Sequence, residues 1–141
     1  MLVRLLYASR AAKDVNNDLL DSILAQSRKH NPAAGVTGIL CYSGSVFMQV
    51  LEGSRREVSI LYNRIANDPR HVGVEILHFE EIAERRFSNW TMGQVNLDKI
   101  NPSVLLKYSE KPALDPFGVS GKMSMALLEE LIATASIVAR N

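Results

Sequence analysis

Five stretches of the chain have the apolar alternation or the short apolar runs that are typical of β-strands. These stretches are residues 2–8, 36–42, 46–52, 74–82 and 90–95. Only Ser43, Gly44 and Ser45 separate the second stretch from the third, which predicts a short-looped antiparallel hairpin. The last two stretches are separated by a charged turn over residues 84–86.

Two segments between these stretches change to helical spacing. The first begins near Asn16, and we expect Pro32 and Gly35 to end it. One stripe of this helix carries Leu20, Ile23, Leu24, Ser27 and Asn31. The second helix begins at a capping-box sequence over residues 54–57 and ends at Asp68-Pro69. Its apolar face carries Val58, Leu61, Tyr62 and Ile65.

The resulting order, βαββαββ, predicts an α+β fold of the ferredoxin-like class. Right-handed crossovers place both helices on one face of a five-stranded mixed sheet, which gives a two-layer sandwich. A Pro- and Gly-containing stretch over 109–121 precedes residues 123–138, which have helical spacing. The apolar positions of this expected helix are Leu127, Leu128, Leu131, Ala135 and Val138. We therefore expect a domain over residues 1–97 and a C-terminal helical extension over 98–141 that covers the other face.

Composition narrows the class of protein. The chain has 141 residues, 47% hydrophobic and 22% charged, so it can bury one core. A net charge of +1 provides no electrostatic footprint of a nucleic-acid or anionic-membrane binder. Glu129 and Glu130 interrupt an apolar segment that is already shorter than the roughly 20 residues that span a bilayer. The first ten residues lack signal-peptide features, so we expect a cytoplasmic protein that binds neither nucleic acid nor membrane.

Cysteine and histidine positions argue against a metal site. Cys41 is the only cysteine, which excludes an internal disulfide and a thiolate cluster, and we expect it in the core. His30, His71 and His78 lack paired metal-ligand spacing. The sequence also contains no Gly-rich phosphate loop and no G-x-S-x-G elbow, so the usual hydrolase signatures are missing.

Several polar side chains share faces that the pattern turns toward the helices. Gln49 alternates in phase with Phe47 and Leu51, and Tyr7 lies on an apolar face of the first strand. Asn31 ends the apolar stripe of the first helix. Burying such a group without a partner costs roughly 1–3 kcal/mol, so these positions require an explanation.

Two interpretations of these polar residues are open. If the faces coincide, they form a dry slot with polar edges that fits a planar heteroaromatic ligand. The other residues of that slot are Ile23, Leu24, Ser27 and Leu40. Alternatively, the Tyr7 hydroxyl points to solvent, Gln49 lies on a sheet edge, and Asn31 merely caps the helix before Pro32.

The same residues belong to a longer series of short motifs. The series comprises Tyr7, His30-Asn31, GVTGILCYSG over 35–44, FMQVLEG over 47–53, RIANDPRH over 64–71 and RRFSNWTM over 85–92. Single motifs of this kind are common. Their order and spacing together resemble the BLUF family, the sensors of blue light using FAD, over residues 2–96.

The resemblance implies that FAD is bound noncovalently with its ring between the two helices. Asn31 would bond the amide edge of the ring, Gln49 would lie between the ring and Tyr7, and Arg64 would reach the pyrimidine carbonyl. The expected cofactor-binding residues are Tyr7, Ile23, Ser27, Asn31, Leu40, Phe47, Gln49, Arg64, Asp68 and Arg70. His71, with Asp68 and Arg70, falls where family members surround the ribityl chain and phosphates, but a solvated helix end is its favoured interpretation.

The resemblance also implies a photoreceptor mechanism. Tyr7 would donate an electron and a proton to the excited flavin, and their return would leave Gln49 rotated or tautomerised, with absorption shifted to the red. An amide suits this role because one reorientation inverts the donor and the acceptor that it offers. Trp90 and Met92, expected on the last strand, would relay the change to residues 90–138. A position in the core explains both residues equally well.

The expected output is a change in protein contacts and not catalysis. A linker and helices are the only elements expected after the sensor, so we predict a stand-alone BLUF protein that is not an enzyme. We expect a homodimer or larger homo-oligomer that binds a separate effector or regulator in one light state. Met123 and Met125 provide an adaptable surface for such contacts.

Two competing functions use the same fold. An acylphosphatase-like hydrolase needs a glycine-containing phosphate loop after the first strand, and residues 8–11 (ASRA) contain no glycine. An RNA-binding sheet needs exposed aromatic residues on its central strands and a basic surface. The hydrolase ranks above the RNA-binding sheet and is the alternative to a photoreceptor.

Overall fold

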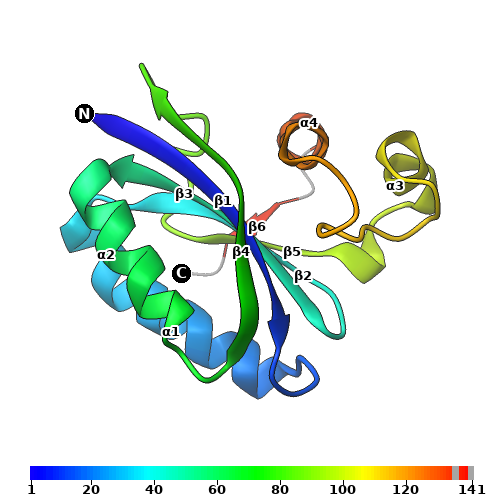
Figure 1. Ribbon diagram of the computed structural model, residues 1–141, viewed down its shortest axis with the longest axis horizontal. Helices are drawn as coiled ribbons and strands as arrows, with labels where there is room; N and C mark the ends of the chain where they lie inside the picture. The colour runs from blue at the N-terminus through cyan, green and yellow to red at the C-terminus, as the bar shows by residue number, and fades with distance from the viewer. Residues whose placement is uncertain (135–136, 140–141) are drawn as a thin grey trace.

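The computed structural model describes residues 1–134 and 137–139 (Figure 1). The strands are β1 (Leu2–Ala11), β2 (Thr37–Tyr42), β3 (Val46–Ser54), β4 (His71–Ile82), β5 (Gly93–Asn96) and β6 (Val138–Ala139). The helices are α1 (Asn17–Ala34), α2 (Arg55–Ala66), α3 (Pro102–Tyr108) and α4 (Gly121–Ala133), with a short 3-10 helix, η1 (Leu97–Lys99).

The strands form one mixed sheet in the order β4-β1-β3-β2-β5-β6. β2 and β5 are parallel, and the other neighbouring pairs are antiparallel. The predicted ferredoxin-like α+β class and its mixed sheet are confirmed. The two-residue strand β6 adds a sixth strand to the five predicted ones, and it is too short to produce a pattern in the sequence.

Capping residues at both ends define helix α1. The Asn16 side chain accepts a hydrogen bond from the backbone N–H of Leu19 at 2.8 Å. At the other end Gly35 has a φ of 70°, and its N–H donates to the carbonyls of Asn31 and Pro32. The prediction that Pro32 ends the helix is wrong. Pro32 lies in the last turn, where its missing N–H removes a single hydrogen bond, and Gly35 makes the actual end.

Helix α2 begins where the sequence predicts. The Ser54 hydroxyl accepts from the backbone N–H of Glu57 at 3.1 Å, so the predicted N-cap is confirmed. The helix ends at Ala66, and Asn67 is its C-cap. The expected stop at Asp68-Pro69 therefore lies just beyond the helix.

The boundaries of two strands differ from the predictions. β4 begins at His71, three residues earlier than the apolar run indicates. β5 begins at Gly93, so Trp90 and Met92 precede the strand that is predicted to carry them. The reason is that Trp90 closes a turn: its N–H donates to the Phe87 carbonyl at 3.2 Å, and its own carbonyl accepts from Gly38 at 3.0 Å.

Helix α4 is shorter than the helix predicted over residues 123–138. It ends at Ala133, where the Thr134 hydroxyl donates back to the carbonyl of Glu130 at 3.0 Å. Val138 belongs to β6 and not to the helix. Ala135, a further predicted helix position, lies outside the described residues.

The sheet separates two apolar clusters. α1 and α2 cover one face, and α3 and α4 lie on the other (Figure 1). The first cluster includes Val3, Leu5, Leu20, Leu24, Leu40, Phe47, Leu51 and Val58. The second includes Leu6, Ile39, Cys41, Met48, Val50, Phe87, Leu105, Leu127, Leu128 and Leu131. The C-terminal helices therefore cover the second face as predicted, and Cys41 is a core residue.

Within residues 1–134 and 137–139, none of the helices combines the length and the apolar content that crossing a membrane requires.

Candidate functional site

A pocket of about 230 Å³ lies between α1, α2 and the sheet. Its lining residues are Tyr7, Ile23, Gln26, Ser27, His30, Asn31, Gln49, Leu61, Arg64, Ile65, Asp68, Arg70 and His71. Sites that bury most of a drug-sized ligand enclose roughly 300–1,000 Å³. This pocket therefore fits a ring system, with the rest of a larger ligand outside it.

Two hydrogen bonds in series cross the floor of the pocket. Tyr7 and Gln49 lie opposite each other on β1 and β3, and the Tyr7 hydroxyl donates to Gln49 Oε1 at 2.5 Å. Gln49 Nε2 donates to Met92 Sδ at 3.2 Å. All three side chains are buried. The two ends of one amide thus bind two different neighbours, which fixes its orientation.

Burial keeps Tyr7 protonated. Its side chain is 1% exposed, and its ring makes edge contacts with the rings of Tyr62 and His71, with centroids 6.1 Å and 6.3 Å away. Desolvation, reinforced by the charge of Asp68, raises the pKa of Tyr7 far above its usual value. The phenol therefore remains a hydrogen-bond donor to Gln49 at neutral pH.

Asn31 carries a buried donor that has no protein acceptor. Its side chain is 2% exposed, and Nδ2 has no hydrogen-bond partner among the described residues. Leaving such a donor unpaired costs about 1–3 kcal/mol. The site therefore fits a ligand that presents an acceptor, such as a ring carbonyl, beside Asn31.

These placements decide between the two interpretations of the polar residues. The Tyr7 hydroxyl is buried, β3 is an interior strand of the sheet, and the Asn31 side chain makes no cap. It is the Asn31 backbone carbonyl that accepts from Val36 at 3.0 Å. The faces of Tyr7, Gln49 and Asn31 coincide, and the alternative of solvent-facing or capping side chains is wrong.

Charged groups occupy another part of the pocket wall. Arg70 Nε donates to both carboxylate oxygens of Asp68 at 3.0 Å. The Arg70 guanidinium also reaches Ser22 Oγ at 3.1 Å and Gln26 Oε1 at 2.6 Å on α1. The hydrogen bond from Arg70 lowers the pKa of Asp68, so this carboxylate stays ionised. The segment after α2 is thereby tied to α1.

His71 is not at a solvated helix end, and that interpretation is wrong. The residue begins β4 and is 8% exposed. Its Nδ1 lies 2.7 Å from the Ser9 hydroxyl, and its ring centroid is 5.0 Å from that of Phe47. Burial lowers the pKa of His71, which favours a neutral imidazole in the pocket wall.

The structure brings together nearly all of the predicted cofactor-binding residues. The predicted residues that line the pocket are Tyr7, Ile23, Ser27, Asn31, Gln49, Arg64, Asp68 and Arg70. Leu40 and Phe47 do not line it, because both are fully buried in the core cluster on this face of the sheet. Their contact with a cofactor stays a prediction.

Five lining residues are absent from the predicted set, and one of them is His71, which begins β4. Gln26 and His30 follow Ile23 by three and seven positions, so helical spacing could have placed them on the same side of α1. Leu61 and Ile65 belong to the apolar face predicted for α2. Helical spacing indicates the faces on which these four residues lie. It does not show which part of such a face borders a cavity.

Trp90 and Met92 lie in different clusters. Met92 is 4% exposed, packs in the α1/α2 cluster and touches Gln49 through its sulfur. Trp90 packs against the cluster on the α3/α4 face. Met92 is therefore the residue that contacts the polar chain of the pocket, and Trp90 is a cover for the opposite core.

Fold and pocket together define a small-molecule-binding domain of the ferredoxin-like class. The family described as "Sensors of blue-light using FAD" (BLUF) matches residues 2–93. The chain belongs to the BLUF family, and FAD is the cofactor of that family. Blue-light sensing is the function that the family establishes for this domain.

Curated relatives carry this domain within longer proteins. Subunit beta of the photoactivated adenylate cyclase of Euglena gracilis is 35% identical over 92 residues, which cover 64% of this chain and 11% of the relative. The blue light- and temperature-regulated antirepressor BluF of Escherichia coli (strain K12) is 34% identical over 87 residues, which cover 62% of this chain and 22% of BluF. This chain thus corresponds to a small part of either relative. In the BLUF family, the domain signals to effectors such as a cyclase or an antirepressor.

Two solved BLUF structures match nearly the whole chain. The photo-activated state of BlsA has a TM-score of 0.81 and 32% identity, and the match covers 94% of this chain and 95% of BlsA. The dark-state structure of BlrB, a BLUF protein, has a TM-score of 0.75 and 34% identity, with 95% and 96% of the two chains covered. The similarity therefore extends beyond residues 2–93 into the C-terminal helices.

Proposed function

We propose that this chain binds FAD noncovalently between α1 and α2 and senses blue light by rearranging the hydrogen bonds of Tyr7 and Gln49. Membership of the BLUF family supports the cofactor and the light. The observation that carries the proposal is the buried chain from the Tyr7 hydroxyl through the Gln49 amide to the Met92 sulfur. Such a chain can exist in two hydrogen-bonded arrangements without any change in covalent structure.

The pocket residues fit the cofactor. Asn31 Nδ2, which lacks a protein acceptor, would donate to a carbonyl of the flavin ring. Arg64, at the end of α2, would approach the same ring edge. Arg70 would supply positive charge toward the phosphate end, where Asp68 and α1 hold its guanidinium. When bound, FAD supplies the absorption of blue light and an excited state that is a strong oxidant.

The protein's part in the switch is proton movement and amide rotation. Tyr7 releases its proton along the 2.5 Å hydrogen bond toward Gln49 Oε1 as it gives up an electron, and it regains both afterwards. Gln49 is left rotated or tautomerised. A rotated amide turns Nε2 toward Tyr7 and removes the donor from Met92 Sδ. The buried position of all three residues excludes water, which would otherwise replace these hydrogen bonds.

We propose that the output is a change in protein contacts and not a reaction. Residues 1–97 would be the sensor, and residues 98–141, with α3 and α4, would carry the response to a separate partner protein. We also propose a homodimer or larger homo-oligomer. The existence of BLUF relatives that are a cyclase and an antirepressor supports an output directed at another domain or protein.

The absorption spectrum of the purified protein, recorded in the dark and after blue light, tests the proposed function. We expect a flavin spectrum that shifts reversibly to the red and returns in the dark. A colourless protein would contradict FAD binding. A flavin spectrum without a reversible shift would contradict the switch.

A further inference from the structure

The segment that delivers Met92 to Gln49 is a long crossover beneath the sheet. β4 and β5 are separated by β1, β3 and β2, so residues 83–92 must pass three strands. Phe87 is fully buried in the cluster on the α3/α4 face, which shows the side on which the segment crosses. Residues 83–92 form this crossover.

The carboxylate of Glu52 holds the middle of the crossover. Glu52 is 0% exposed, and its Oε1 accepts from the backbone N–H of Phe87 at 2.7 Å. Both carboxylate oxygens lie 3.1 Å from the N–H of Arg86. Buried charges are retained only where they are paired and hydrogen-bonded. The Glu52 carboxylate accepts from two backbone N–H groups of the crossover.

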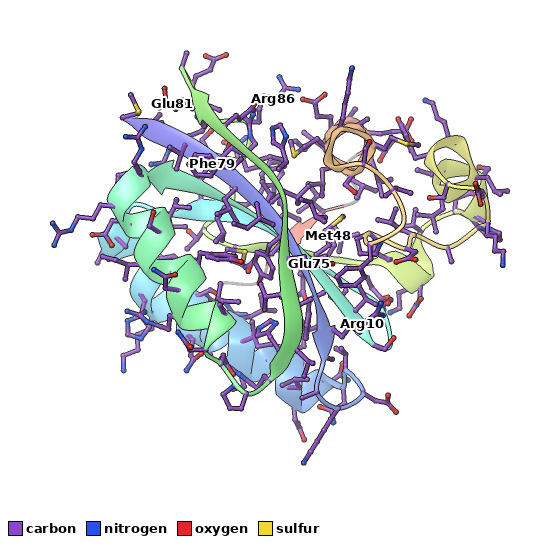
Figure 2. All side chains as sticks on the ribbon, viewed as in Figure 1. Arg10, Met48, Glu75, Phe79, Glu81 and Arg86 are labelled. Carbon is purple, nitrogen blue, oxygen red and sulfur yellow. The ribbon has the colours of Figure 1, made fainter. Side chains whose placement is uncertain are left out.

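Arg4 compensates the charge of Glu52 and fixes its direction. Arg4 lies opposite Glu52 on β1, with Nε and Nη2 at 2.8 Å and 2.7 Å from Oε2. On its other side Arg4 pairs with Glu80 of β4. Three adjacent strands are thereby linked at the point where the crossover leaves β4. Figure 2 shows Glu81, at the end of β4, and Arg86, in the crossover, both at the top of the view.

A second set of hydrogen bonds, made by Arg85, holds the crossover next to the contacts of Glu52. The Arg85 guanidinium donates to Thr37 Oγ1 at 3.0 Å and to the backbone carbonyl of Glu52 at 3.4 Å. The carbonyl of Trp90 then accepts from Gly38 on β2 at 3.0 Å. Two residues later, Met92 Sδ accepts from Gln49. The crossover is thus attached at both ends before Met92 enters the pocket floor.

Gln49 and Glu52 are carried by the same strand, β3, on opposite faces. Strand β3 therefore positions the Gln49 amide and also the Glu52 carboxylate. That carboxylate holds the crossover, which carries the sulfur acceptor of Gln49, Met92 Sδ. We infer that Glu52 is a positioning residue of the switch: by holding the backbone of residues 86–87, it sets the place of Met92 relative to the Gln49 amide. This inference rests on the proposed photocycle.

Substitution of Glu52 by glutamine tests the inference in the flavin-loaded protein. Glutamine has one carbonyl acceptor, so the guanidinium of Arg4 and two backbone N–H groups compete for it. We expect Glu52→Gln to retain the flavin, because Glu52 faces away from the pocket. Its return to the dark state should slow by about threefold or more, because loss of a hydrogen bond weakens the arrangement that holds Met92 on Gln49. Glu81→Gln, which alters an exposed carboxylate paired with Arg55, should leave the rate unchanged.

A second readout separates positioning from general stability. The side-chain amide resonances of Gln49, measured by NMR in the dark, should shift in Glu52→Gln and stay in place in Glu81→Gln. Thr37→Val, which removes the acceptor of Arg85 with little change in shape, should move the same resonances less. If Glu52→Gln does not fold, Thr37→Val decides the question by the same two measurements.

The outcomes distinguish this inference from the proposed function. A wild-type protein without a reversible red shift contradicts the proposed function itself. A wild-type protein with the shift, together with unchanged recovery and unchanged Gln49 resonances in the folded variants, overturns the positioning role of Glu52 alone.

Discussion

The two faces of the sheet are filled in different ways. Toward α1 and α2, the interior contains Tyr7, Gln49 and Asn31 and leaves a pocket of about 230 Å³. Toward α3 and α4, it is closed mainly by aliphatic side chains, and Leu127 and Leu128 of α4 are fully buried. The pocket face keeps polar groups and space for a ligand, whereas the buried ion pair of the other face, Arg4 with Glu52, is paired within the protein.

The difference indicates how one small sheet can serve both stability and sensing. A buried donor without a partner is unfavourable, so Asn31 Nδ2 on the pocket face requires an acceptor from a ligand, whereas Tyr7 and Gln49 already bond each other. The face toward α3 and α4 is packed by buried aliphatic side chains, whose burial stabilises the sheet. The segment leading into β5 connects the two, since Trp90 packs on the apolar face and Met92 on the pocket face.

The largest expected effect comes from removing one hydroxyl on the pocket face. Tyr7→Phe deletes the donor to Gln49 Oε1 and the electron and proton source of the proposed photocycle, so we expect a complete loss of the reversible red shift with flavin retained. Gln49→Leu should have the same effect. Tyr62→Phe removes the hydroxyl of the neighbouring ring and serves as the matched control. Absorption spectra before and after blue light give the answer, and a wild-type shift in Tyr7→Phe would refute its role.

The second effect concerns the apolar face. Leu128→Ala creates a cavity in a fully buried cluster and should lower the free energy of unfolding by about 2–5 kcal/mol. Leu106→Ala on α3, where the side chain is 50% exposed, should cost less than about 0.5 kcal/mol. Urea denaturation of the flavin-loaded protein measures both. Equal losses in the two variants would show that this face is not a closed core.

Most of the fold could be predicted from the sequence, because the spacing of apolar residues indicates which face of each helix or strand is buried. The ferredoxin-like order and both pocket helices follow from alternation and helical spacing. Strand β6 and the late start of β5 could not be predicted, because they depend on backbone pairing and on the turn closed by Trp90. The end of α4 at Ala133 could not be predicted either, because apolar residues continue past it in the sequence.

The candidate site was predictable to a different extent. Phase alone puts Tyr7 and Gln49 on apolar faces of their strands and Asn31 on the apolar stripe of its helix, but the convergence of the three depends on the strand register. The network of Glu52 could not be found in the sequence, because its partners lie on distant segments. In the sequence His71 follows the expected helix stop at Asp68-Pro69, and only its burial and its hydrogen bond with Ser9 show that it is interior.

A smaller effect should follow from truncating the unpaired amide on α1. Asn31→Ala removes the donor that we assign to the flavin carbonyl, so affinity for FAD should fall by about tenfold, the equivalent of one hydrogen bond. The control is Asn63→Ala, an exposed asparagine on α2. Fluorescence titration of flavin-free protein with FAD provides the constants. Unchanged affinity in Asn31→Ala would remove this residue from the binding site.

The smallest expected effect is a pH dependence that belongs to the pocket face. Burial lowers the pKa of His71 below the value of about 6.5 that it has in the unfolded chain, so in this range the unfolded state binds more protons. The stabilisation from neutral His71 should therefore be complete above about pH 6.5 and decrease as the pH falls toward the folded-state pKa. We expect the free energy of unfolding, measured by denaturation at each pH, to fall between about pH 7.5 and 5.5 and to have a flatter profile in His71→Gln. If His71→Gln keeps the wild-type slope, the acid sensitivity arises elsewhere, and the pocket wall then has no part in it.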